Sequence, residues 1–211
     1  MHVHICPSRT RVVEAASAAI SDHASWVASC VGTGTATLPG QHYQVDGAIG
    51  RPLPIQDGGI PLWIAGGGEK KTLRIAAKYA KYTNFDATPD VFRRKSEILA
   101  EHCQDAGTDF DAITRSANFN VIIGETENDV ADKLAWVRAH YEPLVPAESV
   151  ESYMALISSG PLVGTPEQIV ERLAEVRDLG LGYAIGYFVD AAYDRGSIDL
   201  FADKVIPALA D

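Results

Sequence analysis

The chain has 211 residues, of which 46% are hydrophobic and 22% are charged, a composition typical of a globular protein with its own core. Its net charge of −10 argues against nonspecific nucleic-acid binding and against an anionic membrane surface. No apolar run approaches the roughly 20 residues of a membrane span. Cys6, Cys30 and Cys103 form no CxxC pair, so we expect no disulfide framework, no zinc site and a cytoplasmic location.

Residues 1–40 form an atypical N-terminal segment, rich in Ala, Ser, Thr and Val and poor in charge. A short helix is expected over residues 11–20, followed by a loop over 32–37 because two glycines interrupt that stretch. His2 and His4 lie at the terminus and are expected to be exposed, so no metal is predicted. The remainder, residues 41–211, is treated as one domain.

The chain is organised around residues 61–73. An apolar run at 62–64 predicts a buried strand with Trp63 in the core. Gly66, Gly67 and Gly68 follow, and then a helix begins whose buried face carries Leu73, Ala76, Ala77 and Ala80. Glycines let a ligand approach the backbone, and the first N–H groups of a helix have no internal partner. The pattern therefore predicts either a phosphate site, disrupted by a bulky residue at Gly67, or a tight turn without a ligand.

From residue 82 onward, strands and helices alternate. Strands are predicted over 82–85, 117–123 and 183–189. Helices are predicted to start after Thr88, Thr126 and Thr165, with a further one over 149–157 and one at the C-terminus. The predicted inward side chains of these helices are Phe92, Leu99, Cys103, Val130, Leu134, Val137, Val150, Tyr153, Met154, Ile157, Ile169, Leu173, Val176, Ile198, Phe201, Val205 and Leu209.

Strands that alternate with amphipathic helices indicate parallel βαβ units. Both an open doubly wound sheet and a (β/α)₈ barrel fit this pattern. A complete barrel normally takes eight units and roughly 250 residues. The four units recognised here fit half a barrel or a small open sheet.

Four motifs give the chain a family resemblance: residues 42–48 (HYQVDGA), 51–56 (RPLPIQ), 61–70 (PLWIAGGGEK) and 164–168 (GTPEQ). Their order resembles the C-terminal half of the luciferase-like monooxygenase family, and more narrowly its oxidoreductases that use the deazaflavin coenzyme F420. The resemblance implies an α/β fold, a luciferase-like TIM (β/α)₈ barrel that is here incomplete, with residues 41–211 as about its second half.

The resemblance also implies a site. Ala65, Gly66, Gly67 and Gly68 would hold the phosphate of coenzyme F420, or alternatively of FMN, through backbone N–H groups. The expected reaction is hydride transfer with a small-molecule substrate. Sugar-phosphate-oxidising relatives carry a lysine after the following strand, and its absence from residues 86–89 disfavours a sugar phosphate. No catalytic residue is assigned.

Residues 1–40 do not resemble the first half of that barrel, so we expect the chain alone to transfer hydride poorly and to self-associate. A fragment, a disrupted reading frame and a short relative all fit. The alternative function is a non-catalytic half-barrel that associates with itself or a partner. A third interpretation, an unrelated phosphate-binding domain, rests on Asp86, about 20 residues beyond the loop.

The other polar residues have simpler interpretations. Glu69 is interpreted as a favourable partner of the helix dipole. Solvent-exposed positions are expected for Lys70, Lys71, Arg74, His102 and His140.

Overall fold

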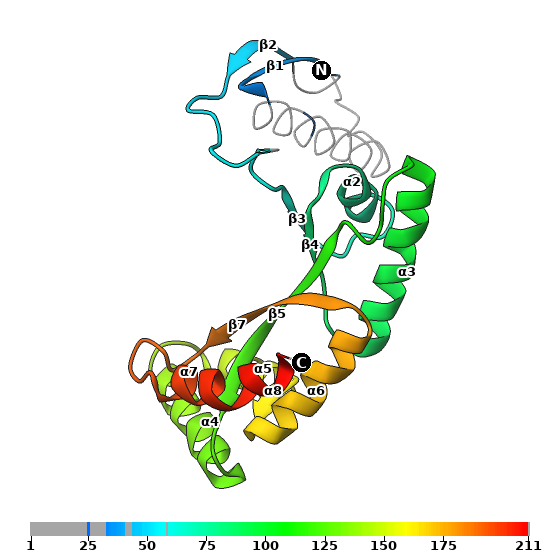
Figure 1. Cartoon of the computed structure of the whole chain (residues 1–211). Coiled ribbons are helices and arrows are strands. Elements are labelled where there is room, and N and C mark those ends of the chain that lie inside the picture. The colour runs from blue at the N-terminus through cyan, green and yellow to red at the C-terminus, as the bar shows by residue number, and fades with distance from the viewer. Residues whose placement is uncertain (1–24, 26–32, 41–43, 58, 211) are drawn as a thin grey trace, which may run out of the picture. The chain divides into compact units, whose positions relative to one another are not determined.

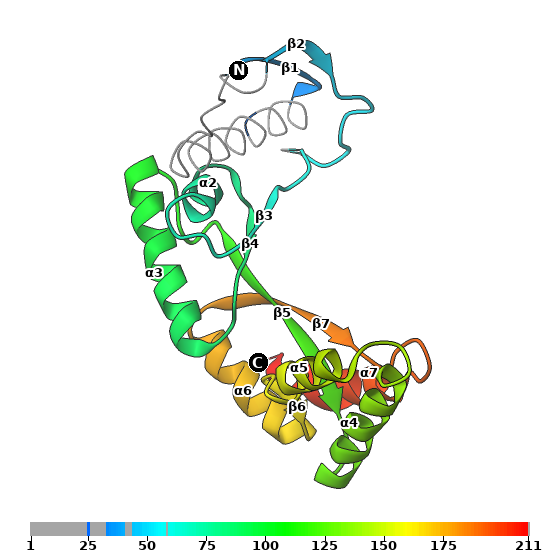
Figure 2. The ribbon, with the colours of Figure 1, turned by 180° about the vertical axis from the view of Figure 1, so that it is seen from behind.

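The computed structural model describes residues 25, 33–40, 44–57 and 59–210. The chain divides into two compact units, residues 1–83 with 95–114 and residues 84–94 with 115–211, and each is described by itself. Figures 1 and 2 show the ribbon from opposite sides. The expected helix at 11–20 and the expectations for His2, His4, Cys6 and Cys30 lie outside the described residues, as do His42 and Tyr43 of the first motif.

The first unit contains an antiparallel hairpin, β1 (Thr35–Pro39) and β2 (Gln44–Ile49), with Thr35 opposite Ile49. The expected loop over 32–37 is therefore wrong from Thr35 onward. Alternation explains the strand, because Ala36 is buried while its neighbours Thr35 and Thr37 face outward, and threonine favours extended structure.

The same unit contains β3 (Trp63–Ala65), α2 (Thr72–Tyr79) and β4 (Tyr82–Asn84), as the sequence predicts. The buried side chains of α2 are Leu73, Ile75, Ala76 and Ala77. The Thr83 hydroxyl on β4 donates a hydrogen bond to the carbonyl of Ile64 on β3 at 2.9 Å. The prediction that Trp63 lies in the core is wrong. Its side chain is 42% exposed, and its ring stacks on Tyr82 with centroids 4.8 Å apart.

Helix α3 (Pro89–Ala106) begins and ends where the sequence predicts. Proline suits the first helical position, because its missing N–H has no partner to lose there. The predicted inward residues Phe92, Leu99 and Cys103 are all buried. Gly107 follows the helix with a φ of +69°, a conformation that favours glycine at a helix C-terminus.

The second unit alternates strands and helices along the rest of the chain. Its elements are β5 (Thr114–Ile123), α4 (Glu127–Tyr141), α5 (Ala147–Ser158), β6 (Leu162–Gly164), α6 (Pro166–Asp178), β7 (Leu181–Phe188), α7 (Gly196–Leu200), a π-helical turn (Phe201–Val205) and α8 (Ile206–Leu209). Thr126 and Asp129 form a capping box at the start of α4. At the start of α6, the Thr165 N–H donates to the Gln168 side chain at 3.1 Å.

Five strands form one sheet in the order β3-β4-β5-β6, with β7 also paired to β5. β5 runs parallel to both β6 and β7. The sequence does not reveal β6, because three residues carry no readable periodicity. Within the described residues the sheet is open and does not close into a barrel.

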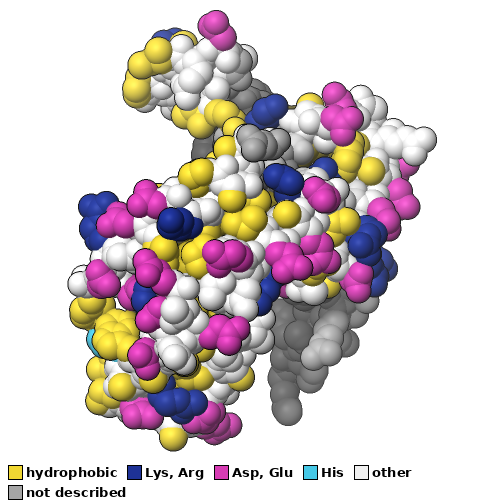
Figure 3. All heavy atoms as spheres, turned by 60° about the horizontal axis from the view of Figure 1, so that its bottom comes forward, with side chains coloured by type: hydrophobic (Ala, Val, Ile, Leu, Met, Phe, Trp, Pro, Cys, Tyr) yellow, Lys and Arg dark blue, Asp and Glu magenta, His cyan; other side chains and the backbone are white. Residues whose placement is uncertain are grey.

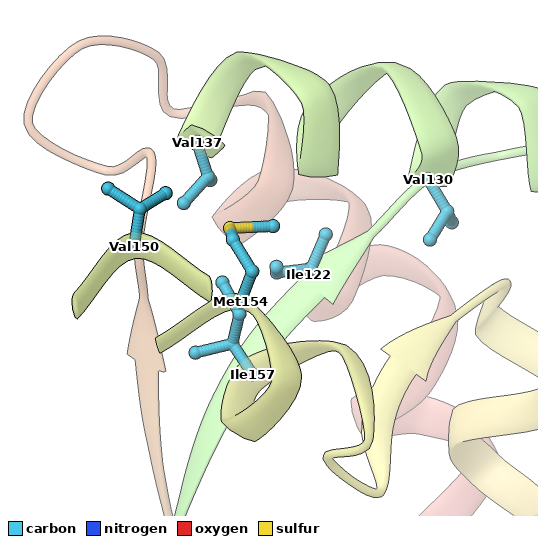
Figure 4. Packing of buried hydrophobic residues seen from close by; sticks show 6 residues of the cluster. All are labelled: Ile122, Val130, Val137, Val150, Met154 and Ile157. Atoms are coloured by element: carbon cyan, nitrogen blue, oxygen red, sulfur yellow. The ribbon is translucent and has the colours of Figure 1, made fainter. Parts of the chain in front are cut away.

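The core of the second unit includes Ile122 of β5 and the facing sides of α4 and α5 (Figure 4). Its buried members are Ile122, Val130, Val137, Val150, Met154 and Ile157. Leu134 and Tyr153, predicted to face inward, are only partly buried beside this cluster. The Arg138 guanidinium of α4 also pairs with the Glu151 carboxylate of α5, and this contact lowers the pKa of Glu151.

The predicted inward side chains of the C-terminal helix are confirmed in part. Val205 is buried, whereas Ile198, Phe201 and Leu209 are half-buried. The π-helical turn widens the helix just before Pro207, which has no N–H to donate to the preceding turn.

No helix within the described residues has the length and apolar character needed to cross a bilayer. On the face in Figure 3, acidic and basic side chains are interspersed and no broad region of one sign stands out.

Candidate phosphate-binding loop

The glycine loop joins the end of β3 to the start of α2, as expected. Gly66 has a φ of +119°, which side-chain-bearing residues rarely adopt. The loop packs closely on Thr72, the first residue of α2. A Cβ added to Gly66 would lie 3.3 Å from Thr72 Cγ2, and one added to Gly68 would lie 2.8 Å from Thr72 Oγ1. Glycine is therefore required here by backbone conformation and by space.

Two side chains of α3 hold the loop from one side. Lys95 Nζ donates to the Gly67 carbonyl at 2.5 Å and to Glu69 Oε1 at 2.9 Å. His102 Nε2 lies 2.8 Å from the Glu69 carbonyl oxygen. The two residues are seven apart, so they lie on the same side of the helix. His102 is thus half-buried against the loop, and the expectation that it is a free surface group is wrong.

The carbonyls of Gly67 and Glu69 are engaged by α3, but the N–H groups of the glycines are not engaged in this way. Within the described part of the chain, Gly66, Gly67 and Gly68 donate no backbone hydrogen bond, whereas the Gly68 carbonyl accepts one from Leu73 N at 3.0 Å. The Thr72 hydroxyl likewise makes no hydrogen bond among the described residues. Donors that are not engaged, in a glycine loop that leads into a helix, are available to an anion.

The charges around the loop are largely compensated. The salt bridge between Glu69 and Lys95 joins two side chains that are 32% and 16% exposed, so Glu69 pairs across to α3 as well as lying near the helix start. Its negative charge therefore opposes a nearby phosphate less than an unpaired carboxylate would. Lys70 and Arg74 are exposed, as expected, and Lys71 is half-buried.

Replacing Lys95 with methionine should loosen the loop while keeping most of the side chain's volume. The change removes a charged hydrogen bond to Gly67 and the partner of Glu69, so we expect unfolding to become easier by about 1–3 kcal/mol. Chemical denaturation measures this. The exposed residue Glu97 of the same helix supplies the control, because Glu97→Met should change stability by less than about 0.5 kcal/mol. Equal effects of the two variants would show that Lys95 does not hold the loop.

Asp86, on which the interpretation as an unrelated phosphate-binding domain rests, stabilises the turn in which it lies. Its carboxylate accepts a hydrogen bond from Thr88 N at 2.7 Å, just before α3 begins. This is an Asx turn, and it accounts for an aspartate at this position without a ribose.

A second polar cluster, which the sequence did not reveal, lies after the C-terminal end of β7. Lys133 Nζ donates to Ser197 Oγ at 2.5 Å, and Ser197 Oγ donates to Asp190 Oδ2 at 2.5 Å. Ser197 is fully buried and Asp190 is 8% exposed. Ser197 cannot meet a substrate from this position, so the cluster is structural. It joins α4 to the segment that follows β7.

An aromatic cluster extends this junction along α4. The Trp136 ring stacks on His140, and the Tyr193 hydroxyl lies 3.0 Å from His140 Nε2. His140 is half-buried among these rings, so the expectation of a free surface group is wrong here too.

Cys103 offers no redox chemistry of its own. It is 1% exposed on α3, and burial raises the pKa of its thiol, although a hydrogen bond with Thr108 lowers it. A buried thiol with a raised pKa stays protonated and is a poor nucleophile.

A parallel sheet, helices between its strands and a glycine loop at a strand's carboxyl end define an α/β protein with a candidate anion site. The chain belongs to the luciferase-like monooxygenase family, whose family model matches residues 19–182. The match therefore starts before residue 41, the first residue of the segment that carries the motifs.

Solved structures agree on the fold. The coenzyme F420 dependent tetrahydromethanopterin reductase from Methanopyrus kandleri superposes with a TM-score of 0.69 at 17% identity, over 92% of this chain and 63% of that one. A monooxygenase from Streptomyces bottropensis gives 0.66 at 14% identity, over 97% and 66%. A riboflavin lyase solved with modified FMN and riboflavin gives 0.62 at 17% identity, over 83% and 48%.

These identities are low, so they establish the fold alone. The chain spans about half to two thirds of the length of these three proteins. Its fold is a luciferase-like (β/α)₈ barrel in incomplete form, as the sequence predicts. No protein of curated function matches the chain.

Proposed function

We propose that Ala65, Gly66, Gly67 and Gly68 bind the phosphate of coenzyme F420 or of FMN, and that the chain serves an oxidoreductase of the luciferase-like class. The observation that carries this proposal is the row of N–H groups at Gly66–Gly68 that donate no backbone hydrogen bond to any described residue, in a loop held between β3 and α2 by Lys95 and His102. When bound, either coenzyme supplies the hydride chemistry, while this loop grips its phosphate end.

Two structural neighbours support the two coenzymes. The reductase from Methanopyrus kandleri is F420 dependent, and the riboflavin lyase was solved with modified FMN. Both coenzymes carry a phosphate, so the loop alone does not choose between them. The choice needs a direct comparison of the two ligands.

The Thr72 hydroxyl is a further donor for the same phosphate. It belongs to the first residue of α2 and lies beside Gly68. Thr72→Val removes the hydroxyl and keeps the side chain's shape, whereas Thr72→Ser keeps the hydroxyl. A hydrogen bond to a charged group contributes about 1.5–3 kcal/mol, so the valine variant should bind about tenfold or more weakly and the serine variant near normally.

The test is to titrate the purified chain with oxidised coenzyme F420 and, separately, with FMN, and to follow ligand fluorescence. A few phosphate contacts should give a dissociation constant of roughly high micromolar to millimolar. Inorganic phosphate should compete, and we expect no appreciable turnover with alcohols. If neither coenzyme binds, or if phosphate fails to compete, the loop is only a turn.

We also propose that the chain self-associates, which is the feature that the alternative, non-catalytic function requires. Strand β7, paired on one side only within the described residues, supports this. Association and coenzyme binding are separate properties and are measured separately.

A further inference from the structure

The second unit contains a cavity of about 390 Å³ that the glycine loop does not line. It is bounded by the start of α3, by the segment that joins α5 to β6, and by one side of α6. The start of α3 lies beside α6 in both ribbon views (Figures 1 and 2). Ligand pockets in proteins usually have volumes of roughly 300–1,000 Å³, so this cavity has room for a small molecule the size of an amino acid.

Much of the wall of the cavity is apolar. Ala87 and Val176 are 7% and 2% exposed, and the side chains of Pro89, Pro161 and Val163 line the same space. Such a wall favours an aliphatic group, because contact with these side chains removes apolar surface from water.

Arg172 is one of two charged side chains that line the cavity, and it is held in a fixed position. Its Nη1 donates to the carbonyls of Pro161 at 3.1 Å and Val163 at 2.8 Å, which uses both hydrogens of that nitrogen. No carboxylate among the described residues pairs with this half-buried cation. Its Nε and Nη2 therefore remain, and these two N–H groups form an edge that binds a carboxylate through two parallel hydrogen bonds.

Glu175 is the other charged side chain of the cavity. It lies three residues after Arg172 on α6, so the two are neighbours on one side of the helix. Glu175 is exposed and forms no ion pair among the described residues, with Arg172 or with any other. The cavity thus presents one positive and one negative group about one helical turn apart. A simple anion would be attracted by the first and repelled by the second, whereas a zwitterion satisfies both.

We propose that this cavity binds an α-amino acid with an apolar side chain. The carboxylate of the amino acid lies on Nε and Nη2 of Arg172, its ammonium group on the Glu175 carboxylate, and its side chain against Ala87 and Val176. None of these residues belongs to the glycine loop, so the inference goes beyond the coenzyme binding proposed above and does not rest on it.

The test is an NMR titration of the full chain, without coenzyme, with three probes of the same carbon skeleton. L-leucine carries both charged groups, 4-methylpentanoate lacks the ammonium group, and L-leucinamide lacks the carboxylate. We expect L-leucine to bind with a dissociation constant of about 1 mM or below, and each of the other two to bind about tenfold or more weakly. The backbone N–H signals of Gly160 and Val163 should shift, and those of Gly66–Gly68 should not.

Two variants assign the contacts. Arg172→Lys keeps the charge and a donor for the two carbonyls but loses the edge that binds a carboxylate twice, so L-leucine should bind about tenfold more weakly. Arg177→Lys is the control, because Arg177 is exposed on the same helix and does not line the cavity. Glu175→Gln should weaken L-leucine about tenfold and leave 4-methylpentanoate unaffected or more tightly bound.

Thermal unfolding of each variant separates lost binding from lost structure. Glu175 makes no hydrogen bond or ion pair among the described residues, so Glu175→Gln tests the site even if Arg172→Lys is unstable. Failure of L-leucine to bind, binding no tighter than that of 4-methylpentanoate, or an unchanged affinity in Glu175→Gln would each overturn the proposal. Failure of coenzyme F420 and FMN to bind would contradict the proposed function and leave this inference standing.

Discussion

Replacing Gly66 with valine is expected to abolish coenzyme binding and to lower stability. At a φ of +119° a β-branched residue is strained by about 1–3 kcal/mol, and its Cβ would press on Thr72 Cγ2. The loop has to move, and its N–H groups then no longer converge on one anion. Losing two charged hydrogen bonds corresponds to roughly 3 kcal/mol or more, which is about a hundredfold in affinity.

The measurement is coenzyme titration beside thermal unfolding. Gly107→Val is the matched control, because Gly107 also has a positive φ, +69°, but an added Cβ there meets nothing within 4 Å. Both variants should lose stability, and only the Gly66 variant should lose binding. If Gly66→Val still binds coenzyme at normal affinity, these N–H groups do not hold the phosphate.

The sequence pointed to Gly67 as the critical position. In the structure the glycine with the restrictive backbone conformation is its neighbour, Gly66. The glycine run showed that the backbone is exposed to a ligand. It did not show which of three glycines takes the unusual φ, because that depends on how β3 enters the loop and where Thr72 sits. Of the three, Gly66 is the one with a positive φ.

Local signals predicted the helices well. Pro89 and Pro166 at first helical positions, the capping residues Thr126 and Thr165, and Gly180 with a φ of +96° all lie at helix boundaries that the sequence indicated. These signals are strong because each acts within one turn of helix and depends little on distant residues.

Contacts between distant segments were not predictable in the same way. Lys95 and His102 are 26 and 33 residues beyond Glu69, and an isolated helix sequence does not show which residues face a loop. The exposure of Trp63 has a similar origin. An apolar strand residue is buried only if another layer covers it, and the described part of the sheet is open.

Replacing Asp190 with alanine should be among the most damaging single changes away from the apolar core. Its carboxylate accepts a hydrogen bond from the fully buried Ser197 and lies 3.4 Å from Lys133 Nζ. Alanine leaves the buried Ser197 hydroxyl without its acceptor and the partly buried Lys133 ammonium without its ion-pair partner. Each such loss costs about 1–3 kcal/mol, so we expect a total of about 3 kcal/mol.

The expected readout is a fall of about 6–12 °C in melting temperature, given about 2–4 °C per kcal/mol for a chain of this size. Asp194→Ala is the control, because among the described residues that exposed carboxylate accepts one hydrogen bond, from Gly196 N at 3.0 Å. It should cost less than about 1 kcal/mol.

A third variant separates the loss of the charge from the loss of the whole network. Changing Lys133 to methionine, Asp190 to leucine and Ser197 to alanine together removes every polar member, so no partner is left unpaired. Replacing a buried ionic cluster with apolar groups of similar volume is often nearly neutral. The triple variant should therefore be more stable than Asp190→Ala alone. If it is less stable, or if Asp190→Ala costs no more than Asp194→Ala, the three residues do not act as one buried network joining α4 to the segment after β7.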